Sequence, residues 1–329
     1  MRFKLLKKSD KIEKVYKKEI KEYWKKFNLK PRLYWHKFYT SRNGIKDVRY
    51  IPEDYFFAYI VPYYNKLDLS KAYVDKAQYS RLFPDVKRPN TIAKNVNGFF
   101  YDDFFNPIEI EDVLNKCENY SRIIVKPTIE SGAGKNIVFI NEDDKDEMRK
   151  KVEEAIQKFK KNFIIQEILR QHEVLNNLNP SSVNTIRVVS FVHKNEVHIL
   201  STHIRIGTNN SKYDHYGIFC GIEDDGVLQD RAYVYKLGEI VYEHPQGYNF
   251  KGVRIPNFEA LKETVKRIHK RIGYFRLISW DFAIDENGEP VLIEMNIRWQ
   301  GLNHNQLTLG PLFGSLTDEV INEVFNGVK

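Results

Sequence analysis

The spacing of apolar and polar residues divides the chain into predicted helices, strands and loops. Apolar residues at helical spacing predict helices over 10–28, 67–83, 109–119, 143–160, 257–272 and 315–326. Strands are predicted over 122–126, 136–140 and 163–169, with a strand and turn in 90–107 and hairpins at 183–206 and 278–297. Gly-punctuated segments at 207–222 and 298–314 are predicted loops, and the aromatic-rich stretch 31–85 predicts a mixed first lobe.

The hairpin at 278–297 has the clearest turn signal in the chain. Asn287-Gly288 lies between two alternating runs, and a two-residue turn of this type needs φ > 0 at both positions. Such a turn pairs Glu286 with Glu289 and places Asp281 opposite Glu294. Apolar residues then share one face of the hairpin, so the other face is predicted to be polar.

Two carboxylates and an amide share that polar face: Asp281, Glu294 and Asn296. Carboxylates that face each other across strands repel unless a cation lies between them. Hard oxygen ligands of this kind suit Mg²⁺, or Mn²⁺ in its place. The alternative is the ordinary solvated face of an amphipathic hairpin.

Composition indicates a folded globular protein, because 42% of the 329 residues are hydrophobic and 14% are aromatic. The longest apolar-leaning run, 55–64, is too short to span a bilayer, and the charged N-terminus does not resemble a signal peptide. Cys117 and Cys220 form neither a disulfide framework nor a metal-binding motif. A cytoplasmic location is therefore expected.

The net charge of +8 is concentrated at the N-terminus. Residues 1–50 contain 17 Lys or Arg against 5 Asp or Glu, so the rest of the chain is slightly acidic. This basic segment predicts contact with an anionic membrane surface or an acidic polymer, and no specific nucleic acid is expected. The alternative is a solvated face of a lysine-rich helix.

The segment 125–140 predicts a strand, a Gly-rich loop and a second strand. Successive backbone N–H groups in such a loop can turn toward an anion, and lysine adds a point charge. The candidate residues are Lys126, Ser131, Gly132, Gly134 and Lys135. An ordinary turn is the alternative, because no helix with the Walker pattern follows.

A strand and a second hairpin add further candidates. The strand 163–169 ends near Gln166 and Glu167, which could hold an adenine amine and a ribose hydroxyl; a plain core strand is the alternative. In the 183–206 hairpin, a turn of three or five residues around Asn195 places Arg187 opposite His203, with Thr185 and Arg205 on the same face. Two arginines on one face call for an anion, which Arg binds in a fork geometry.

From about residue 85 to the end, these parts in this order resemble the ATP-grasp superfamily. The phrases KNVNGFFYDD, KPTIESGAGK, NPSSVNTIRV and IEMN are most similar to sugar-transfer-associated ATP-grasp proteins of polysaccharide and capsule biosynthesis. The resemblance implies an α+β ATP-grasp fold with the nucleotide between two antiparallel-rich β-sheet lobes and a mixed N-terminal lobe. The implied parts are an N-terminal lobe at 1–85, a central lobe at 86–170 and a C-terminal lobe at 171–329.

The resemblance also implies roles for individual residues. The D…ExN pattern of Asp281, Glu294 and Asn296 is similar to the metal motif of D-alanine–D-alanine ligases. The remaining implied ATP contacts are the phosphate lysines Lys94 and Lys126, the covering loop 130–136, and the adenine hinge Gln166, Glu167 and Ile168. Those ligases carry an Arg where this chain has Ser279, so Arg187 or Arg205 would supply the charge.

The expected function is that of an ATP-dependent carboxylate–amine ligase that acts through an acyl phosphate. Its expected partners are a uronic acid or amino acid and an amine, with Arg298 a candidate clamp for the substrate carboxylate. One alternative is a kinase for a sugar-type hydroxyl, with Asp214, His203 or His304 as the base. Another is a basic binding module whose ATP site is vestigial.

Overall fold

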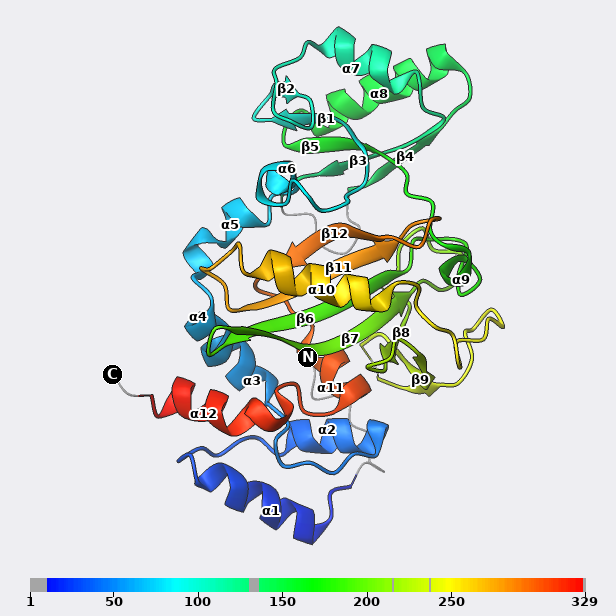
Figure 1. The fold of residues 1–329 in the computed structure, drawn as a ribbon. Coiled ribbons are helices and arrows are strands. Elements are labelled where there is room, and N and C mark those ends of the chain that lie inside the picture. Colours follow the sequence, from blue (N-terminus) through cyan, green and yellow to red (C-terminus); the bar gives the residue numbers. More distant parts are fainter. Residues whose placement is uncertain (1–10, 130–135, 215, 237, 328–329) are drawn as a thin grey trace. The chain divides into compact units, whose positions relative to one another are not determined.

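The computed structural model of the chain describes residues 11–129, 136–214, 216–236 and 238–327 (Figure 1). These residues form two compact units, each assembled from segments distant in sequence. The first unit draws on Met1–Leu67, Val174–Asp281 and Met295–Lys329, and the second on Asp68–Glu173 and Phe282–Glu294. The division into three lobes stays a prediction, although 86–170 falls wholly within the second unit.

Within the described residues, the second unit contains an antiparallel sheet of strand order β2-β1-β5-β3-β4. The strands are β1 (Thr91–Val96), β2 (Phe99–Tyr101), β3 (Arg122–Pro127), β4 (Val138–Asn141) and β5 (Phe163–Glu167). The apolar faces of α7 (Ile110–Cys117) and α8 (Lys145–Phe159) share one core with these strands. The strands and helices predicted between residues 90 and 169 are confirmed.

The single helix predicted over 67–83 is wrong. The chain instead forms η3 (Leu67–Leu69), α5 (Ser70–Tyr73), η4 (Lys76–Gln78) and α6 (Tyr79–Leu82). Asp75 is extended, and its carboxylate accepts a hydrogen bond from the Ala77 backbone N–H. An extended capping residue ends one helix and begins the next, so the apolar spacing alone could not reveal the break.

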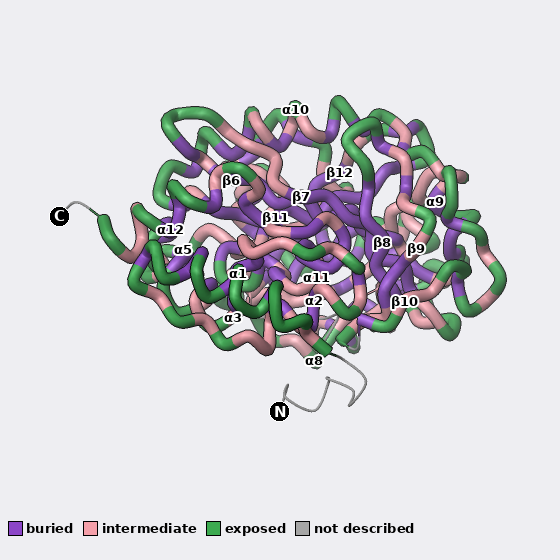
Figure 2. Tube along the Cα trace, turned by 90° about the horizontal axis from the view of Figure 1, so that it is seen from below, coloured by how far each residue is buried: buried purple, intermediate pink, exposed green. Residues whose placement is uncertain are grey.

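The first unit is built on a sheet of order β10-β9-β8-β7-β6-β11-β12 among the described residues. Its strands are β6 (Thr185–His193), β7 (Glu196–Ile206), β8 (Ile218–Ile222), β9 (Leu228–Val234), β10 (Ile240–Val241), β11 (Leu277–Ile284) and β12 (Pro290–Asn296). The distal part of the β11–β12 hairpin, Phe282–Glu294, is grouped with the second unit. Figure 2 shows β6, β7 and β11 buried along most of their length. In β11 both faces are buried, so its polar face is not a solvated one.

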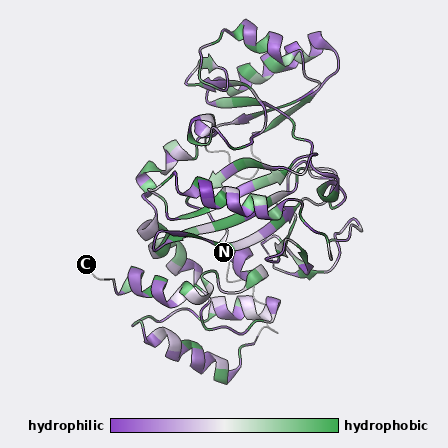
Figure 3. Ribbon diagram, in the orientation of Figure 1, coloured by the Kyte–Doolittle hydropathy of each residue, from purple (hydrophilic) through white to green (hydrophobic). Residues whose placement is uncertain are grey.

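Helices complete the first unit. The helices are α1 (Lys14–Lys25), α2 (Tyr34–Asn43), α3 (Glu53–Tyr55), η2 (Phe56–Ile60), α4 (Val61–Tyr64), α9 (Glu173–Asn176), α10 (Phe258–His269), α11 (Leu302–Leu309), η5 (Gly314–Leu316) and α12 (Thr317–Phe325). Purple and green alternate along α1, α8 and α10 in Figure 3, as expected for amphipathic helices. In the segment 31–85, predicted as a mixed lobe, the described residues form helices and an isolated β-bridge from Asn65 to Phe275. No helix in the described part of the chain is long and apolar enough to cross a bilayer.

The β6–β7 hairpin has the predicted pairing but not the predicted turn. His193 pairs with Glu196, so the turn has only two residues, and both Lys194 and Asn195 have φ > 0. A register shift after Val189 then restores the predicted pairing of Arg187 with His203. A β-bulge thus compensates for the shorter turn.

The turn of the β11–β12 hairpin also differs from the prediction. Asp285 and Glu289 close the turn, since the Asp285 backbone N–H donates to the Glu289 carbonyl, and Gly288 donates to the Asp285 carbonyl. Only Gly288 has φ > 0, whereas both central positions were predicted to. The Asp285 carboxylate accepts from the backbone N–H groups of Asn287 and Glu289, which favours this longer turn.

Two predicted loops contain regular structure. Segment 207–222 includes β8, where a Cβ at Gly217 would lie 1.9 Å from the Ile206 carbonyl oxygen. Segment 298–314 includes α11, which Gly301 and Gly310 flank. These glycines allow close approach of strands and the start and end of a helix, and they do not form loops. The number of glycines in a segment could not distinguish these roles.

Candidate functional site

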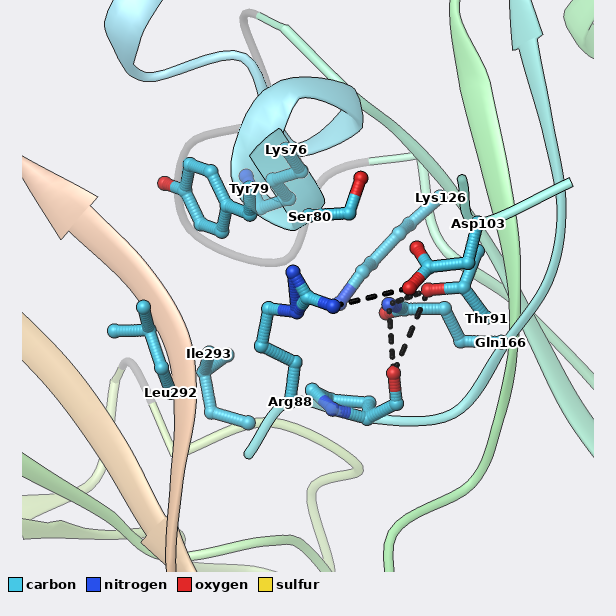
Figure 4. Close-up of a pocket in the computed structure, with 11 residues that line it drawn as sticks. Lys76, Tyr79, Ser80, Arg88, Thr91, Asp103, Lys126, Gln166, Leu292 and Ile293 are labelled. Atoms are coloured by element: carbon cyan, nitrogen blue, oxygen red, sulfur yellow. Dashed lines mark hydrogen bonds and ion pairs between the residues drawn. The ribbon is translucent and has the colours of Figure 1, made fainter. Parts of the chain in front are cut away.

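A pocket in the second unit gathers basic, amide and hydroxyl groups (Figure 4). It is lined by Lys76, Tyr79, Ser80, Arg88, Pro89, Thr91, Asp103, Lys126, Gln166, Leu292 and Ile293. The residues come from the segment after the Asp75 break, from β1, β3, β5 and β12, and from the segments just before β1 and just after β2. Of the predicted site residues, Lys126 and Gln166 line this pocket.

Two lysines of the pocket lie near one carboxylate. Lys76 Nζ is 3.1 Å from Glu294 Oε2. Burial and the nearby Lys76 charge lower the pKa of Lys126 to about 8, and Glu294 acts in the opposite direction. Two cations that share one carboxylate leave positive charge for an anion. Sequence reasoning missed Lys76 because it placed this residue on the face of a continuous helix; the Asp75 cap was the available signal.

Gln166 presents an unpaired oxygen to the pocket. Its Nε2 donates to Thr91 Oγ1 at 3.1 Å and to the Pro89 carbonyl at 3.4 Å, which fixes the orientation of the amide. Its Oε1 is buried and has no hydrogen-bond partner among the described residues. A buried oxygen without a partner marks the position of a missing donor.

Arg88 presents the complementary feature. Its Nη2 donates to Asp103 Oδ2 at 3.0 Å, while its buried Nη1 has no hydrogen-bond partner among the described residues. Burial lowers the pKa of Arg88, and Asp103 opposes that shift. The pocket therefore combines an unpaired donor with an unpaired acceptor, which suits a planar polar group that carries one of each.

Lys94 lies behind the pocket wall rather than in its lining. It is 1% exposed, and its Nζ donates to Ser80 Oγ and the Asp103 carbonyl, both at 2.7 Å, with Asp103 Oδ1 at 3.1 Å. An ammonium group has three donors, and three oxygens surround this one. Lys94 therefore positions Ser80 and Asp103, both of which line the pocket.

The other predicted adenine-binding residues, Glu167 and Ile168, are not among the residues that line the pocket. Glu167 is exposed, and its backbone N–H donates to the Asn90 carbonyl. The backbone N–H of Ile168 donates to the Arg122 carbonyl. The predicted loop residues Ser131, Gly132, Gly134 and Lys135 lie outside the described residues.

A second polar cluster forms in the first unit around Asp281, which is 0% exposed. Arg187 donates to both carboxylate oxygens of Asp281 at 2.7 Å, through Nε and Nη2. Arg205 Nη2 donates to Oδ2 at 3.0 Å, and Asn296 Nδ2 lies 3.3 Å from the same oxygen. The structure thus brings together four of the predicted site residues, with the two arginines neutralised in part by Asp281.

Thr185 and Asp214 extend this cluster. Arg205 donates to Thr185 Oγ1 through Nε at 2.9 Å and Nη2 at 2.6 Å, and its Nε is 3.5 Å from Asp214. Thr185 donates to Asp214 through both its hydroxyl and its backbone N–H. Burial raises the pKa of Asp214, although Arg205 and Thr185 act in the opposite direction. Every charged group in this cluster therefore has a charged or hydroxyl neighbour.

The chemistry of the predicted metal ligands fits Mg²⁺. Asp281 and Glu294 offer carboxylates and Asn296 an amide oxygen, all hard donors. Asp281 and Asn296 share one face, as predicted. Among the described residues, no three His, Cys, Asp or Glu side chains are grouped to hold a metal ion, so the triad, which includes an amide, stays a prediction.

Arg298 and His304 follow the metal motif in sequence. Arg298 is exposed, and its Nη2 donates to the Leu67 carbonyl at 3.0 Å. His304 lies on α11 with its ring 4.3 Å from that of Phe219 and 5.7 Å from that of His203. The structure therefore places His304, and not Arg298, beside the arginine-bearing face of the sheet.

The two antiparallel sheets define an α+β protein, and one of them carries a pocket lined by lysines and by polar atoms without partners among the described residues. The chain belongs to the sugar-transfer associated ATP-grasp family, which matches residues 58–320. The predicted family and fold class are confirmed. A comparison with curated proteins found no match.

Several solved structures are similar to the chain at low identity. The biotin carboxylase domain of Hydrogenobacter thermophilus 2-oxoglutarate carboxylase, in complex with MgADP, ADP and bicarbonate, is 15% identical with a TM-score of 0.44. The ATP-grasp ligase PsnB, complexed with a minimal precursor, is 15% identical with a TM-score of 0.46. N5-carboxyaminoimidazole synthetase from Staphylococcus aureus, complexed with ADP, is 14% identical with a TM-score of 0.44. The matches cover 78%, 79% and 77% of this chain and 46%, 64% and 51% of those chains.

Proposed function

We propose that the protein is an ATP-dependent carboxylate–amine ligase and that the pocket in its second unit binds the nucleotide. The observation that carries this proposal is the pair of unpaired atoms in the pocket, Gln166 Oε1 and Arg88 Nη1. Adenine presents an amino donor beside a ring-nitrogen acceptor on one edge, whereas guanine presents two acceptors there. An acceptor and a donor in the pocket therefore complement adenine.

The lysines of the pocket would bind the phosphates. Lys76 and Lys126 line the pocket, and both lie near the carboxylate of Glu294. A bound phosphate would favour the charged form of Lys126, whose pKa of about 8 is otherwise lowered by burial. Lys94 would act through Ser80 and Asp103, and the loop residues Ser131, Gly132, Gly134 and Lys135 would cover the phosphates.

Asp281, Glu294 and Asn296 would hold Mg²⁺, or Mn²⁺ in its place. When bound, the metal would neutralise phosphate charge and orient the terminal phosphoryl group. Arg187 and Arg205 would offset the charge that develops on that group. Because both arginines donate to Asp281, they would hold this carboxylate in a fixed orientation.

The reaction would proceed in two steps. A substrate carboxylate attacks the γ-phosphorus of ATP, a P–O bond forms, and ADP leaves. A neutral amine then attacks the carbonyl carbon of the acyl phosphate. A C–N bond forms, the C–O bond to phosphate breaks, and the nitrogen loses a proton to the departing phosphate or to solvent, which leaves the amide. The chain's residues orient the reactants and exclude water, which would otherwise hydrolyse the acyl phosphate.

The test is release of ADP and phosphate from ATP with uronic acids and amino acids, each with and without amines. We expect ADP and phosphate in equal amounts, dependent on both partners. Glu294→Gln should lower kcat by at least about 100-fold, as expected for loss of a metal ligand. Glu289→Gln is the matched control, because Glu289 is an exposed residue on the same hairpin that pairs with Lys87. Equal activity of the two variants would contradict the metal assignment.

Asp281→Ala should also be inactive. Loss of the Asp281 carboxylate leaves two buried arginines without their partner, which can cost several kcal/mol of stability. Circular dichroism and nucleotide binding would therefore accompany its assay. A folded Asp281→Ala variant that turns over like the wild type would exclude the proposed metal site. A folded variant that binds nucleotide but is inactive would support it.

A kinase is the second candidate function, and one observation favours it. Burial and the charges of His304, Arg187 and Arg205 lower the pKa of His203, so its imidazole is neutral and can accept a proton from a hydroxyl. A kinase would form ADP and a phosphorylated sugar without an amine and without free phosphate. The phosphate measurement in the same assay separates the two functions.

The product would serve polysaccharide or capsule biosynthesis, and the association of the family with sugar transfer supports this part of the proposal. The reaction would take place in the cytoplasm, where ATP is available. The N-terminal basic segment would add a contact with an anionic membrane surface or an acidic polymer. In α1 the lysines are exposed while Tyr16, Ile20 and Trp24 are buried, so the positive charge faces solvent. Cosedimentation with phosphatidylserine vesicles, weakened by salt, would test this contact.

A further inference from the structure

The sheet of the first unit carries its arginines and His203 on the same face. Cross-strand partners share a face, so the pairings of β6 to β9 define which side chains are neighbours. One row across the sheet is Thr185, Arg205, Phe219 and Tyr233, and the next is Arg187, His203 and Gly221. Gly221 has no side chain, and the side chain of Gln229 lies at the position that a Cβ would take there, with Oε1 2.4 Å away.

His203 has unused hydrogen-bonding capacity. Its side chain is 0% exposed, and neither ring nitrogen has a hydrogen-bond partner among the described residues. A neutral imidazole offers one donor and one acceptor, the same pair that a hydroxyl group offers. Buried polar atoms without partners are costly, so a site of this kind points to a ligand group or water.

A series of aromatic rings connects this buried histidine with the surface. Tyr216 is 59% exposed, and its ring lies 5.5 Å from that of Tyr235. Tyr235 lies 5.3 Å from His304, and His304 lies 5.7 Å from His203. Lys236 extends over the rings of both tyrosines. The series therefore begins at an accessible tyrosine and ends beside Arg187.

The charges around this series favour an anion and disfavour a cation. Arg187, Arg205 and Lys236 are cationic, and Arg187 Nη1 lies within 3.2 Å of the position a Cβ would take at Gly301. The two nearby carboxylates are engaged: Asp281 accepts from both arginines, and Asp214 accepts from Thr185. A substrate ammonium group would thus meet cations without an uncommitted carboxylate among these residues.

We propose that Tyr216, Tyr235, His304, His203 and Arg187 form the acceptor subsite of the ligase, and that its substrate is a sugar acid rather than an amino acid. The inference deepens the proposed function and rests on it. Aromatic rings would contact the apolar face of the sugar ring, His203 would hydrogen-bond a hydroxyl, and Arg187 would bind the carboxylate. An α-amino acid would place its ammonium group among the arginines.

Binding of D-glucuronate to the full chain tests the proposal without turnover. Saturation-transfer difference NMR, with and without MgADP, should show contact with the sugar ring protons. D-Glucose lacks the carboxylate and should bind at least about tenfold more weakly, since a charge-assisted hydrogen bond is lost. D-Alanine and L-glutamate should not compete with D-glucuronate.

Variants of Tyr235 identify the site. Tyr235→Ala should weaken D-glucuronate binding on the order of tenfold, and Tyr235→Phe should retain it because the ring remains. Tyr242→Ala is the matched control, since Tyr242 is 63% exposed and lies outside the ring series. His203→Leu should abolish binding, while His203→Gln, which keeps a donor and an acceptor, should retain part of it.

The outcomes separate this inference from the proposed function. No binding of D-glucuronate, or equal binding to wild type and Tyr235→Ala, would overturn the subsite. Competition by D-alanine, together with ADP release from that amino acid, would overturn the sugar-acid assignment while the ligase stands. A Lys126→Met variant that loses nucleotide binding but still binds D-glucuronate would support a subsite separate from the nucleotide pocket.

Discussion

At the scale of single residues, the fixed amide of Gln166 predicts the choice of nucleotide. Gln166→Leu removes the Oε1 acceptor and the bonds to Thr91 and Pro89. Loss of one neutral hydrogen bond of about 1 kcal/mol should raise the KM for ATP roughly fivefold to tenfold. The preference for ATP over GTP should fall in parallel, because guanine no longer meets an acceptor. Gln157→Leu, at an exposed position of α8, is the control, and an unchanged ATP-to-GTP ratio in Gln166→Leu would contradict the assignment.

A second prediction at this scale concerns Gly301, which begins α11 with φ of +78°. An alanine Cβ there would lie 3.2 Å from Arg187 Nη1 and 3.4 Å from His304 Nδ1. Gly44 has the same φ of +78° but no atom within 4 Å of its Cβ position, so it isolates the backbone strain. We expect Gly44→Ala to lower the free energy of unfolding by about 1 kcal/mol without loss of activity. Gly301→Ala should lower the free energy of unfolding at least as much and should also lower kcat/KM. Equal activity of the two variants would contradict this, because it would show that Arg187 and His304 tolerate displacement by the new Cβ.

At the scale of elements, the two hairpins make a matched test of turn geometry. Asn195 has φ of 66°, whereas Asn287 lies outside the left-handed region. Asn195→Ala should therefore lower the free energy of unfolding by about 1 kcal/mol, because alanine lacks the tolerance of asparagine for φ > 0. Asn287→Ala should have a smaller effect in the same urea titration. A larger loss at Asn287 would argue for a turn with two left-handed residues.

These hairpins also show how far local sequence determines an element. The alternation of residues in 183–206 and 278–297 predicted the strands and the pairing of Arg187 with His203, since faces are set by a period of two. The turns were not predictable. In the first hairpin a bulge after Val189 compensates for a shorter turn, and in the second the side chain of Asp285 favours a longer turn. The break at Asp75 has the same origin: a single cap competes with a helical apolar pattern.

At the scale of the whole molecule, the order of motifs predicted the fold class and the family, because each motif is a local pattern in a fixed sequence. The lining of the pocket in the second unit was predicted only in part. Lys126 and Gln166 lie on strands whose pattern is evident. Lys76 begins the short helix η4 after the break at Asp75, and Arg88 lies in an irregular segment, so the direction of both depends on tertiary contacts. The burial of Lys94 by Ser80 and Asp103 was likewise invisible in the sequence.

The stability of the first unit should depend on two histidines that are buried in the neutral state. His269 accepts from the Ser190 hydroxyl through Nδ1 and donates to the Phe275 carbonyl through Nε2, while Trp280 donates to Ser190. His36 lies 3.1 Å from the Val48 carbonyl. Burial lowers the pKa of each histidine from 6.5 to about 4, although the backbone hydrogen bonds oppose the shift.

The sign of the pH effect follows from these values. Each histidine takes up a proton near pH 6.5 when unfolded but only near pH 4 when folded, so acid favours the unfolded state. The free energy of unfolding should be steady above about pH 7 and should fall by roughly 2 kcal/mol per histidine by pH 4.5. Urea titrations at pH 7.5, 5.5 and 4.5 measure this loss, and NMR of the imidazole nitrogens shows whether His36 and His269 stay neutral. A free energy that is unchanged between pH 7.5 and 4.5, or imidazoles that titrate near pH 6.5 in the folded protein, would mean that water reaches these side chains and that the packing around them is looser than the hydrogen bonds indicate.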